Sequence, residues 1–103
     1  MEVVYDRSVM RFIDTLEKPA RTKAVHAIDL LVKFGHTLTL PVSRKIQNNV
    51  FELRVRGRQE VRLLYAFSSG KALIVHGFVK KTNKTPRKEI VYAENRFRLL
   101  TGI

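Results

Sequence analysis

The sequence predicts an α+β fold, in which an N-terminal strand and a helical hairpin pack on a small antiparallel sheet and a helix follows at the C-terminus. Three observations predict it. Apolar residues in the first third recur at the spacing of amphipathic helices, those in the middle alternate with a period of two, and helical spacing returns at the end. Because 103 residues can bury one core and not a second, we expect a single domain over residues 1–103.

The first third predicts a strand and two helices. The stretch EVVYD is β-branched and aromatic and indicates a short strand, after which Asp6 or Ser8 can cap a helix. The apolar side of that helix consists of Val9, Phe12, Ile13 and Leu16. Pro19 ends it and suits the first turn of a second helix, which Gly35 terminates. The apolar stripe of the second helix consists of Ala20, Ala24, Ala27, Ile28, Leu31 and Phe34.

The apolar period changes in the second half. Residues 36–49 show no periodicity, and we expect a connector there. Alternation then predicts three antiparallel strands, over residues 50–57, 60–67 and 71–79. Gly57 and Gly70 predict the hairpin turns between them. Thr85 and Pro86 predict the start of the last helix as N-cap and first-turn proline. Its apolar stripe consists of Ile90, Ala93, Phe97 and Leu100.

The register of the first hairpin follows from the requirement that apolar faces coincide, since a slip of one residue turns a core face outward. A loop over residues 57–59 pairs Leu53 with Leu63. On the opposite face the same loop sets Arg54 beside Arg62. We therefore expect two arginines side by side, on the face away from the helical hairpin.

Applied to the second hairpin, the same requirement favours a loop over residues 68–70. That loop pairs Leu63 with Val75, and Arg62 with His76. With the first hairpin, this predicts a basic row across three strands, which consists of Arg54, Arg62 and His76.

Chemistry, rather than stability, explains such a row. Like charges directly opposite each other destabilise a sheet by roughly 0.2–1 kcal/mol per pair. Arginine forks bind phosphate and imidazole moves protons, as a phosphoryl-transfer site requires. Lys80 falls on the same face as His76 and adds a cation at the rim. In the alternative interpretation, Glu52 and Glu60 neutralise the arginines and His76 packs under the last helix.

The net charge of +11 is concentrated in one half of the chain. Residues 1–40 contain six basic and five acidic side chains, whereas residues 41–103 contain fourteen basic and four acidic ones. This asymmetry favours a polyanion-binding face over a uniformly solvated basic surface, which remains the alternative.

Composition also indicates a compartment. Without cysteine the chain has no disulfide framework and no thiolate metal site. No apolar stretch approaches the length of a membrane span, and MEVVYDRSV is not a signal peptide. We expect a cytoplasmic protein with no membrane partner, no metal and no cofactor.

Two stretches, FELRVRGRQEVRLLYAF and ALIVHGFVKKTNKTPRKEIVYAENR, closely resemble the phage-derived HigB-like branch of the RelE/ParE toxin superfamily. In that branch an E-L-R strand, an arginine and tyrosine in the next strand, and H-G-F-x-K-K-T-x-K-T-P before a helix occur in this order. The resemblance implies the toxin of a type II toxin–antitoxin system. Such toxins are mostly ribosome-dependent mRNA interferases, endoribonucleases that inhibit translation by using the 2′-hydroxyl of the RNA as nucleophile, without a metal.

The resemblance also implies roles for single residues. Arg62 would hold the scissile phosphate, Arg54 would neutralise the transition state, and Lys80 matches the cationic end of the third strand. The residues expected to bind the RNA backbone are Lys45, Arg56, Lys81, Lys84, Arg87 and Lys88. Many relatives carry a C-terminal tyrosine or histidine for proton transfer, whereas here only Tyr92 follows the lysines. His76 is a substitute on the strength of the predicted register alone.

The resemblance implies three partners, namely a helix-turn-helix, HigA-like antitoxin, the ribosome and mRNA. Two alternatives of other classes stay open. A ParE-like inhibitor of DNA gyrase would share the fold without needing His76. A non-catalytic basic nucleic-acid-binding module would bind in a salt-sensitive way that tolerates Arg62→Ala.

Overall fold

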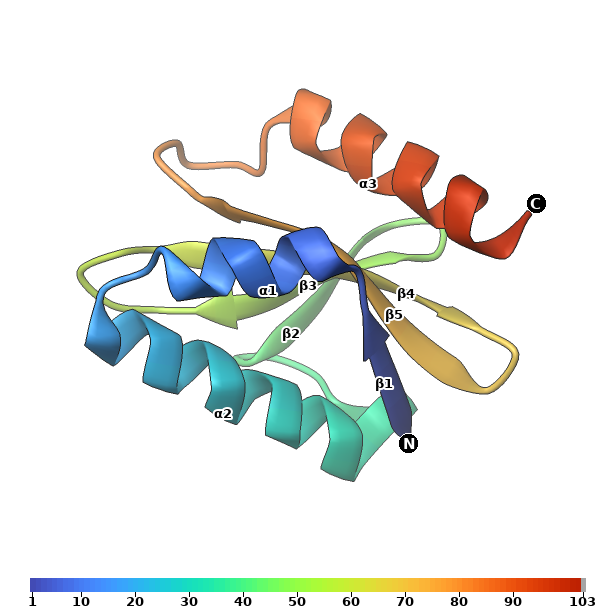
Figure 1. The fold of residues 1–103 in the computed structure, drawn as a ribbon, viewed down its shortest axis with the longest axis horizontal. Coiled ribbons are helices and arrows are strands. Elements are labelled where there is room, and N and C mark those ends of the chain that lie inside the picture. The colour runs from blue at the N-terminus through green and yellow to red at the C-terminus, as the bar shows by residue number, and fades with distance from the viewer. Residues whose placement is uncertain (103) are drawn as a thin grey trace.

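The computed structural model describes residues 1–102 and has the predicted α+β architecture (Figure 1). The helices are α1 (Arg7–Asp14), α2 (Lys18–Phe34), the short 3₁₀ turn η1 (Gly35–Thr37) and α3 (Arg87–Thr101). The strands are β1 (Glu2–Tyr5), β2 (Ser43–Gln47), β3 (Val50–Val55), β4 (Val61–Ser68) and β5 (Lys71–Val79). They form one sheet in the order β1-β5-β4-β3-β2, with β1 parallel to β5 and the other neighbours antiparallel.

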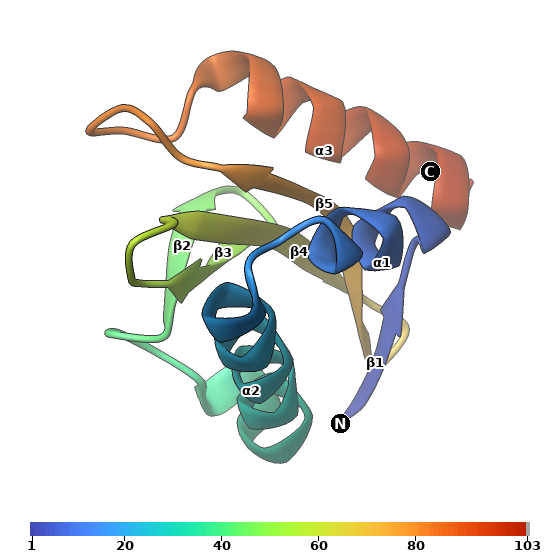
Figure 2. The ribbon, with the colours of Figure 1, turned by 60° about the vertical axis from the view of Figure 1, so that its left-hand side comes forward.

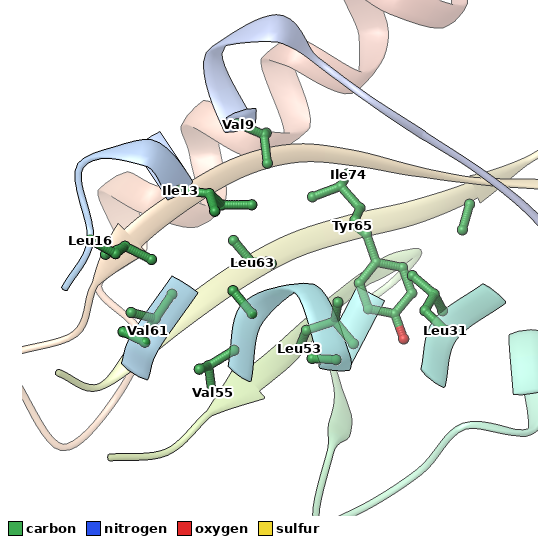
Figure 3. Packing of buried hydrophobic residues seen from close by; sticks show 14 residues of the cluster. Val9, Ile13, Leu16, Leu31, Leu53, Val55, Val61, Leu63, Tyr65 and Ile74 are labelled. Atoms are coloured by element: carbon green, nitrogen blue, oxygen red, sulfur yellow. The ribbon is translucent and has the colours of Figure 1, made fainter. Parts of the chain in front are cut away.

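The sheet separates two helical layers. Helices α1 and α2 pack on one face, and α3 lies on the other (Figures 1 and 2). Under the helical hairpin, Val9 and Ile13 of α1 and Leu31 of α2 meet the inward side chains of the strands, among them Leu53 and Leu63 (Figure 3). A smaller cluster under α3 consists of Leu64, Val75, Phe78 and Ala93. No helix within residues 1–102 is long and apolar enough to cross a membrane.

The prediction of a connector over residues 36–49 is wrong for residues 43–47, which form the edge strand β2. This strand has one apolar side chain, Ile46, so it has no apolar periodicity to detect. Ser43 holds it to the core by a 2.5 Å hydrogen bond to the Tyr65 hydroxyl. Asn48, with φ of 45°, makes the turn into β3, a conformation that asparagine tolerates better than most residues.

The predicted register of the first hairpin is confirmed, because Leu53 pairs with Leu63 and Arg54 pairs with Arg62. That of the second hairpin is wrong. Its turn has two residues and not three, since Ser68 pairs with Lys71. The intervening Ser69 and Gly70 have φ of 51° and 75°, the combination of a type I′ turn that matches strand twist.

An irregularity in β5 then shifts the pairing once more. Between the pairs Tyr65–Ile74 and Leu64–His76, Val75 is an extra residue on β5. As a result, Phe78 and not His76 lies opposite Arg62. The predicted basic row is therefore correct for its two arginines and wrong for His76.

The start of α3 also differs from the prediction. The helix begins at Arg87, and Pro86 occupies the N-cap position expected for Thr85. Thr85 instead donates a hydrogen bond from its hydroxyl to the Glu52 carboxylate, 2.8 Å away. Residues 80–86, here called the cationic loop, thus contact β3 before the helix begins.

A candidate nucleic-acid interface

The arginine pair, Arg54 and Arg62, is the centre of the candidate site. The two residues are direct cross-strand partners on β3 and β4, on the sheet face that carries α3. The side chain of Arg62 is only 2% exposed and that of Arg54 is 19% exposed. Two arginines in directly opposite positions on neighbouring strands repel each other, and burial strengthens the effect for Arg62, so neighbouring carboxylates must compensate them.

Glu52 is the first of these carboxylates. Its side chain is 1% exposed and lies between three arginines. One oxygen is 3.2 Å from Arg44 Nη2 and 4.0 Å from Arg54 Nε, and the other is 3.9 Å from Arg62 Nε. Neither of these Nε atoms has a hydrogen-bond partner among the described residues. The buried Glu52 carboxylate therefore neutralises both arginines of the pair at ion-pair distance.

Glu60 is the second carboxylate and faces solvent more. Its Oε1 accepts a hydrogen bond from Arg62 Nη2 at 3.3 Å and pairs with Arg56 Nε at 3.0 Å. Its Oε2 accepts from the backbone N–H of Gly57 at 2.9 Å. The Gly57 hydrogen bond, together with the two arginines, outweighs partial burial and lowers the pKa of Glu60. Glu60 is thus held ionised against Arg62. Glu52 and Glu60 thus neutralise the arginine pair, as the alternative interpretation of the sequence predicted.

An open cavity of about 500 Å³ lies over this cluster. The β3–β4 turn and the cationic loop leave the sheet at the same end, beyond the first turn of α3 (Figure 1). The charged residues that line the cavity are Arg54, Arg56, Glu60, Arg62, Lys80 and Lys81. Burial and the nearby Arg62 lower the pKa of Lys80, whose ammonium group donates to the Asn83 carbonyl at 2.7 Å.

The predicted RNA-binding residues lie in different parts of the structure. Arg56 and Lys81 line this cavity, and Lys84 lines a neighbouring one of about 450 Å³ with Arg44. Arg87 and Lys88 are exposed in the first turn of α3. Two cations at the positive end of a helix macrodipole do not stabilise the helix, which favours a role in binding.

Lys45 is placed differently from the other predicted RNA-binding residues. It pairs with Phe51 across β2 and β3 and also borders the second cavity. Its ammonium group lies 6.0 Å from the centre of the Phe51 ring, which packs against the core under the helical hairpin. The charge of Lys45 is therefore on the sheet face opposite the arginine pair.

His76 packs under α3, outside the cavity. Its ring lies 4.4 Å from that of Tyr92 and 5.6 Å from that of Phe78, between ring centres. Its Nε2 is hydrogen-bonded to Glu89 at 3.0 Å. These contacts join β5 to the first two turns of α3.

Sequence reasoning missed Arg44 and Thr85, and gave Glu52 a lesser part than it has. Arg44 lies opposite Glu52 on the strand that lacked apolar periodicity. A turn signal was present in the Asn48–Asn49 dipeptide, which could have indicated a β2–β3 hairpin. Nothing local in the sequence indicates that Thr85 contacts Glu52.

The fold and the site define an α+β protein in which a buried arginine, Arg62, and a half-buried one, Arg54, pair beneath a cationic cavity. In fold it is similar to a chain of the crystal structure of the heterotetrameric YoeB–YefM toxin–antitoxin complex from Staphylococcus aureus. The TM-score is 0.55 at 11% sequence identity, over 80% of this chain and 97% of that chain. No curated protein matches the chain.

The chain belongs to the family described as phage derived protein Gp49-like (DUF891), whose model matches residues 11–98. The matched range contains the arginine pair, both carboxylates and the cationic loop.

Proposed function

We propose that this chain is the cytoplasmic toxin of a type II toxin–antitoxin pair, of the HigB-like branch of the RelE/ParE superfamily, and that it acts as a ribosome-dependent mRNA interferase. The observation that carries the proposal is the arginine pair, which lies beneath a cationic cavity although like charges directly opposite each other destabilise a sheet. The fold similarity to the YoeB–YefM complex supports the same class of protein.

In the proposed reaction, the 2′-hydroxyl of a ribose attacks the adjacent phosphodiester. The P–O5′ bond breaks, and a cyclic phosphate and a free 5′-hydroxyl remain. The phosphate first displaces Glu60 from Arg62, whose Nη2 it then occupies. Arg54 and Lys80 neutralise the charge that develops on the phosphoryl oxygens.

Two residues of the cavity suit the proton transfers. Glu60 loses one cationic partner when phosphate binds, so its basicity rises and it accepts the proton of the 2′-hydroxyl. Lys80, with its lowered pKa, donates a proton to the leaving 5′ oxygen. His76, which lies outside the cavity, has no direct part in this scheme.

The remaining cations would bind RNA backbone on the ribosome. Lys81, Lys84, Arg87 and Lys88 extend from the cavity along the cationic loop and the first turn of α3. Such contacts release counterions and make binding salt-dependent. A helix-turn-helix, HigA-like antitoxin that covers the cavity would silence the toxin.

The test is to express the chain in bacteria and map 5′-hydroxyl RNA ends across the transcriptome, with and without a block of translation. Arg54→Ala removes a partly exposed arginine of the pair, and Arg11→Ala on α1 is the control for loss of one exposed cation. We expect cuts in codon register that require translation, disappear in Arg54→Ala and persist in Arg11→Ala.

Other results would point to the alternative functions. Growth arrest with DNA damage and without RNA cuts would indicate a ParE-like gyrase inhibitor. Salt-sensitive RNA binding that tolerates Arg62→Ala, again without cuts, would indicate a non-catalytic module.

A further inference from the structure

The Glu52 carboxylate is a junction between three strands and the cationic loop. It lies on β3 and pairs with Arg44 of β2 and Arg62 of β4. It also accepts the hydroxyl hydrogen bond of Thr85, which is 33 residues away in sequence. Its side chain is 1% exposed and is not among the residues that line the cavity. An RNA phosphate in the cavity would therefore not touch it.

We propose that Glu52 is the positioning residue of the site: its carboxylate orients the arginine pair from behind and, through Thr85, holds the cationic loop over the cavity. The inference rests on the proposed function and adds to it the element that keeps the phosphate-binding groups in place.

The orientation of Arg62 supports the first part. Its Nε faces Glu52 at 3.9 Å, its Nη2 bonds to Glu60 at 3.3 Å, and its Nη1 bonds to the Val61 carbonyl at 3.0 Å. The guanidinium group is thus held by hydrogen bonds at Nη1 and Nη2, and at Nε by the charge of Glu52 at ion-pair distance. When RNA phosphate displaces Glu60, Glu52 and the carbonyl remain to hold that group, so Nη2 stays directed into the cavity.

The attachment of the cationic loop supports the second part. At its start, the Lys80 N–H donates to the Glu60 carbonyl at 2.7 Å. At its end, Thr85 donates to Glu52 at 2.8 Å. Without the second contact, the lysines would be repelled by the arginine pair, and the loop would move away from the cavity. The Thr85–Glu52 hydrogen bond therefore holds the end of the cationic loop at the sheet.

The pKa of Lys80 depends on the charge of Glu52 and so gives a measurable sign of its position. The groups acting on Lys80 are Arg62 and Arg44, which oppose its protonation, and Glu52 and Glu60, which favour it. Replacing Glu52 by glutamine keeps the shape and an acceptor for Thr85 but removes one negative charge. Lys80 then loses its proton at lower pH than in the wild-type protein.

The experiment compares Thr85→Val, Thr85→Ser and Glu52→Gln in the full chain. Thr22→Val is the control for the same substitution away from the site, because Thr22 donates an exposed hydroxyl hydrogen bond to the Lys18 carbonyl on α2. Three readouts are measured: amide hydrogen exchange of residues 80–86, binding of a short 2′-O-methyl RNA that cannot be cut, and cleavage on translating ribosomes.

For Thr85→Val we expect faster exchange in residues 80–86 and a kcat about tenfold lower, with KM and probe affinity changed by less than about threefold, because all charges remain while their placement is lost. Thr85→Ser restores the wild-type values, and Thr22→Val retains them. In Glu52→Gln, probe affinity declines at lower pH than in the wild type.

If the amide hydrogens of residues 80–86 exchange at the wild-type rate in Thr85→Val, the Thr85–Glu52 hydrogen bond does not hold the cationic loop. An unshifted pH profile in Glu52→Gln would overturn the positioning role of its charge. If Glu52→Gln does not fold, the two Thr85 variants decide. If the wild type binds the probe without cutting RNA, the proposed function fails, whereas exchange and probe binding still decide the positioning proposal.

Discussion

Arg62 donates from Nη2 to the carboxylate of Glu60, 3.3 Å away, and this ion pair occupies the edge of the buried guanidinium that borders the cavity. With 2% of its side chain exposed, Arg62 has no free edge for an incoming anion. Phosphate binding at Arg62 is therefore an exchange of one anion for another, and the strength of the Glu60 contact opposes it.

Glu60→Gln is expected to separate binding from chemistry. Glutamine can still accept from the Gly57 N–H, but it competes less for Arg62, so we expect the 2′-O-methyl RNA probe to bind about three- to tenfold more tightly at low salt. Cleavage should fall by about a hundredfold or more, because the proposed base is lost. Fluorescence anisotropy and single-turnover cleavage measure the two effects, with Glu2→Gln as control. Unchanged affinity would show that Glu60 does not occupy the phosphate position.

His76→Phe is expected to leave cleavage nearly intact. Loss of a direct acid or base costs about a hundredfold or more, whereas phenylalanine keeps the stacking on Phe78 and Tyr92, so we expect a loss below about threefold. The free energy of unfolding should fall by about 1 kcal/mol through loss of the Glu89 hydrogen bond. A hundredfold loss of cleavage in a stably folded variant would return His76 to the catalytic role that the sequence suggested.

The lowered pKa of Lys80 predicts a pH dependence of RNA binding. Burial and the charge of Arg62 disfavour the protonated form of Lys80, so this side chain loses its charge at a lower pH than an ordinary lysine, whose pKa is 10.5. We expect probe affinity to decline as the pH approaches that value. Lys80→Arg should not show the decline, because arginine stays charged. Parallel profiles for the two proteins would exclude Lys80 from binding.

The lowered pKa of Lys80 also affects stability, but in the opposite direction: RNA affinity declines as pH rises, whereas the contribution of Lys80 to stability increases. Because the unfolded chain binds this proton more tightly than the folded chain, the Lys80 contribution to the free energy of unfolding rises with pH in that range.

The ion pair of Asp6 and Arg96 predicts an acid-sensitive stability. Partial burial disfavours the Asp6 carboxylate, but the hydrogen bond from Arg96 Nε at 2.9 Å, hydrogen bonding from Ser8 and the charge of Arg96 outweigh it, and the pKa of Asp6 is lowered. Its stabilising effect is therefore complete above the unfolded pKa and is lost as pH falls through the folded one. At neutral pH, Asp6→Asn should lower the free energy of unfolding by about 1 kcal/mol, since Arg96 is partly solvated.

Denaturant unfolding of the wild type and Asp6→Asn at several pH values checks this expectation. The difference should close in acid. Glu2→Gln, which breaks an exposed 3.9 Å contact with Lys71, should change little at any pH. A difference that persists at the lowest pH would assign the effect to packing.

Gly77 is the glycine of the H-G-F part of the motif, and it lies against Phe12 of α1 and Leu63 of β4. A Cβ at this position would lie 2.5 Å from Phe12 Cδ2 and 2.9 Å from Leu63 Cδ2. Gly77→Ala should therefore destabilise the fold by about 1–3 kcal/mol through overpacking. Thermal unfolding measures it, with Gly70→Asn as a turn control that meets no neighbour and tests only the cost of a side chain at a φ of 75°, which asparagine tolerates better than most residues. Wild-type stability of Gly77→Ala would mean that α1 can shift freely on β5.

The sequence by itself determined the elements that have a strong apolar period. Both helices of the hairpin, α3 and three strands were predicted from such periods. So was the pairing of Arg54 with Arg62, because Leu53 and Leu63 must share a face, and a loop one residue shorter would instead place Leu53 beside Arg62.

Tertiary structure alone decided the rest. β2 is a polar edge strand held by one buried hydrogen bond, so its sequence has no apolar pattern. The extra residue Val75 in β5 moved His76 away from the arginine pair, and pairing across a bulge depends on both strands together. The Thr85–Glu52 contact joins residues 33 positions apart. Local periodicity reports which face of one element is buried, whereas the site depends on contacts between elements, which exist only when the chain has folded.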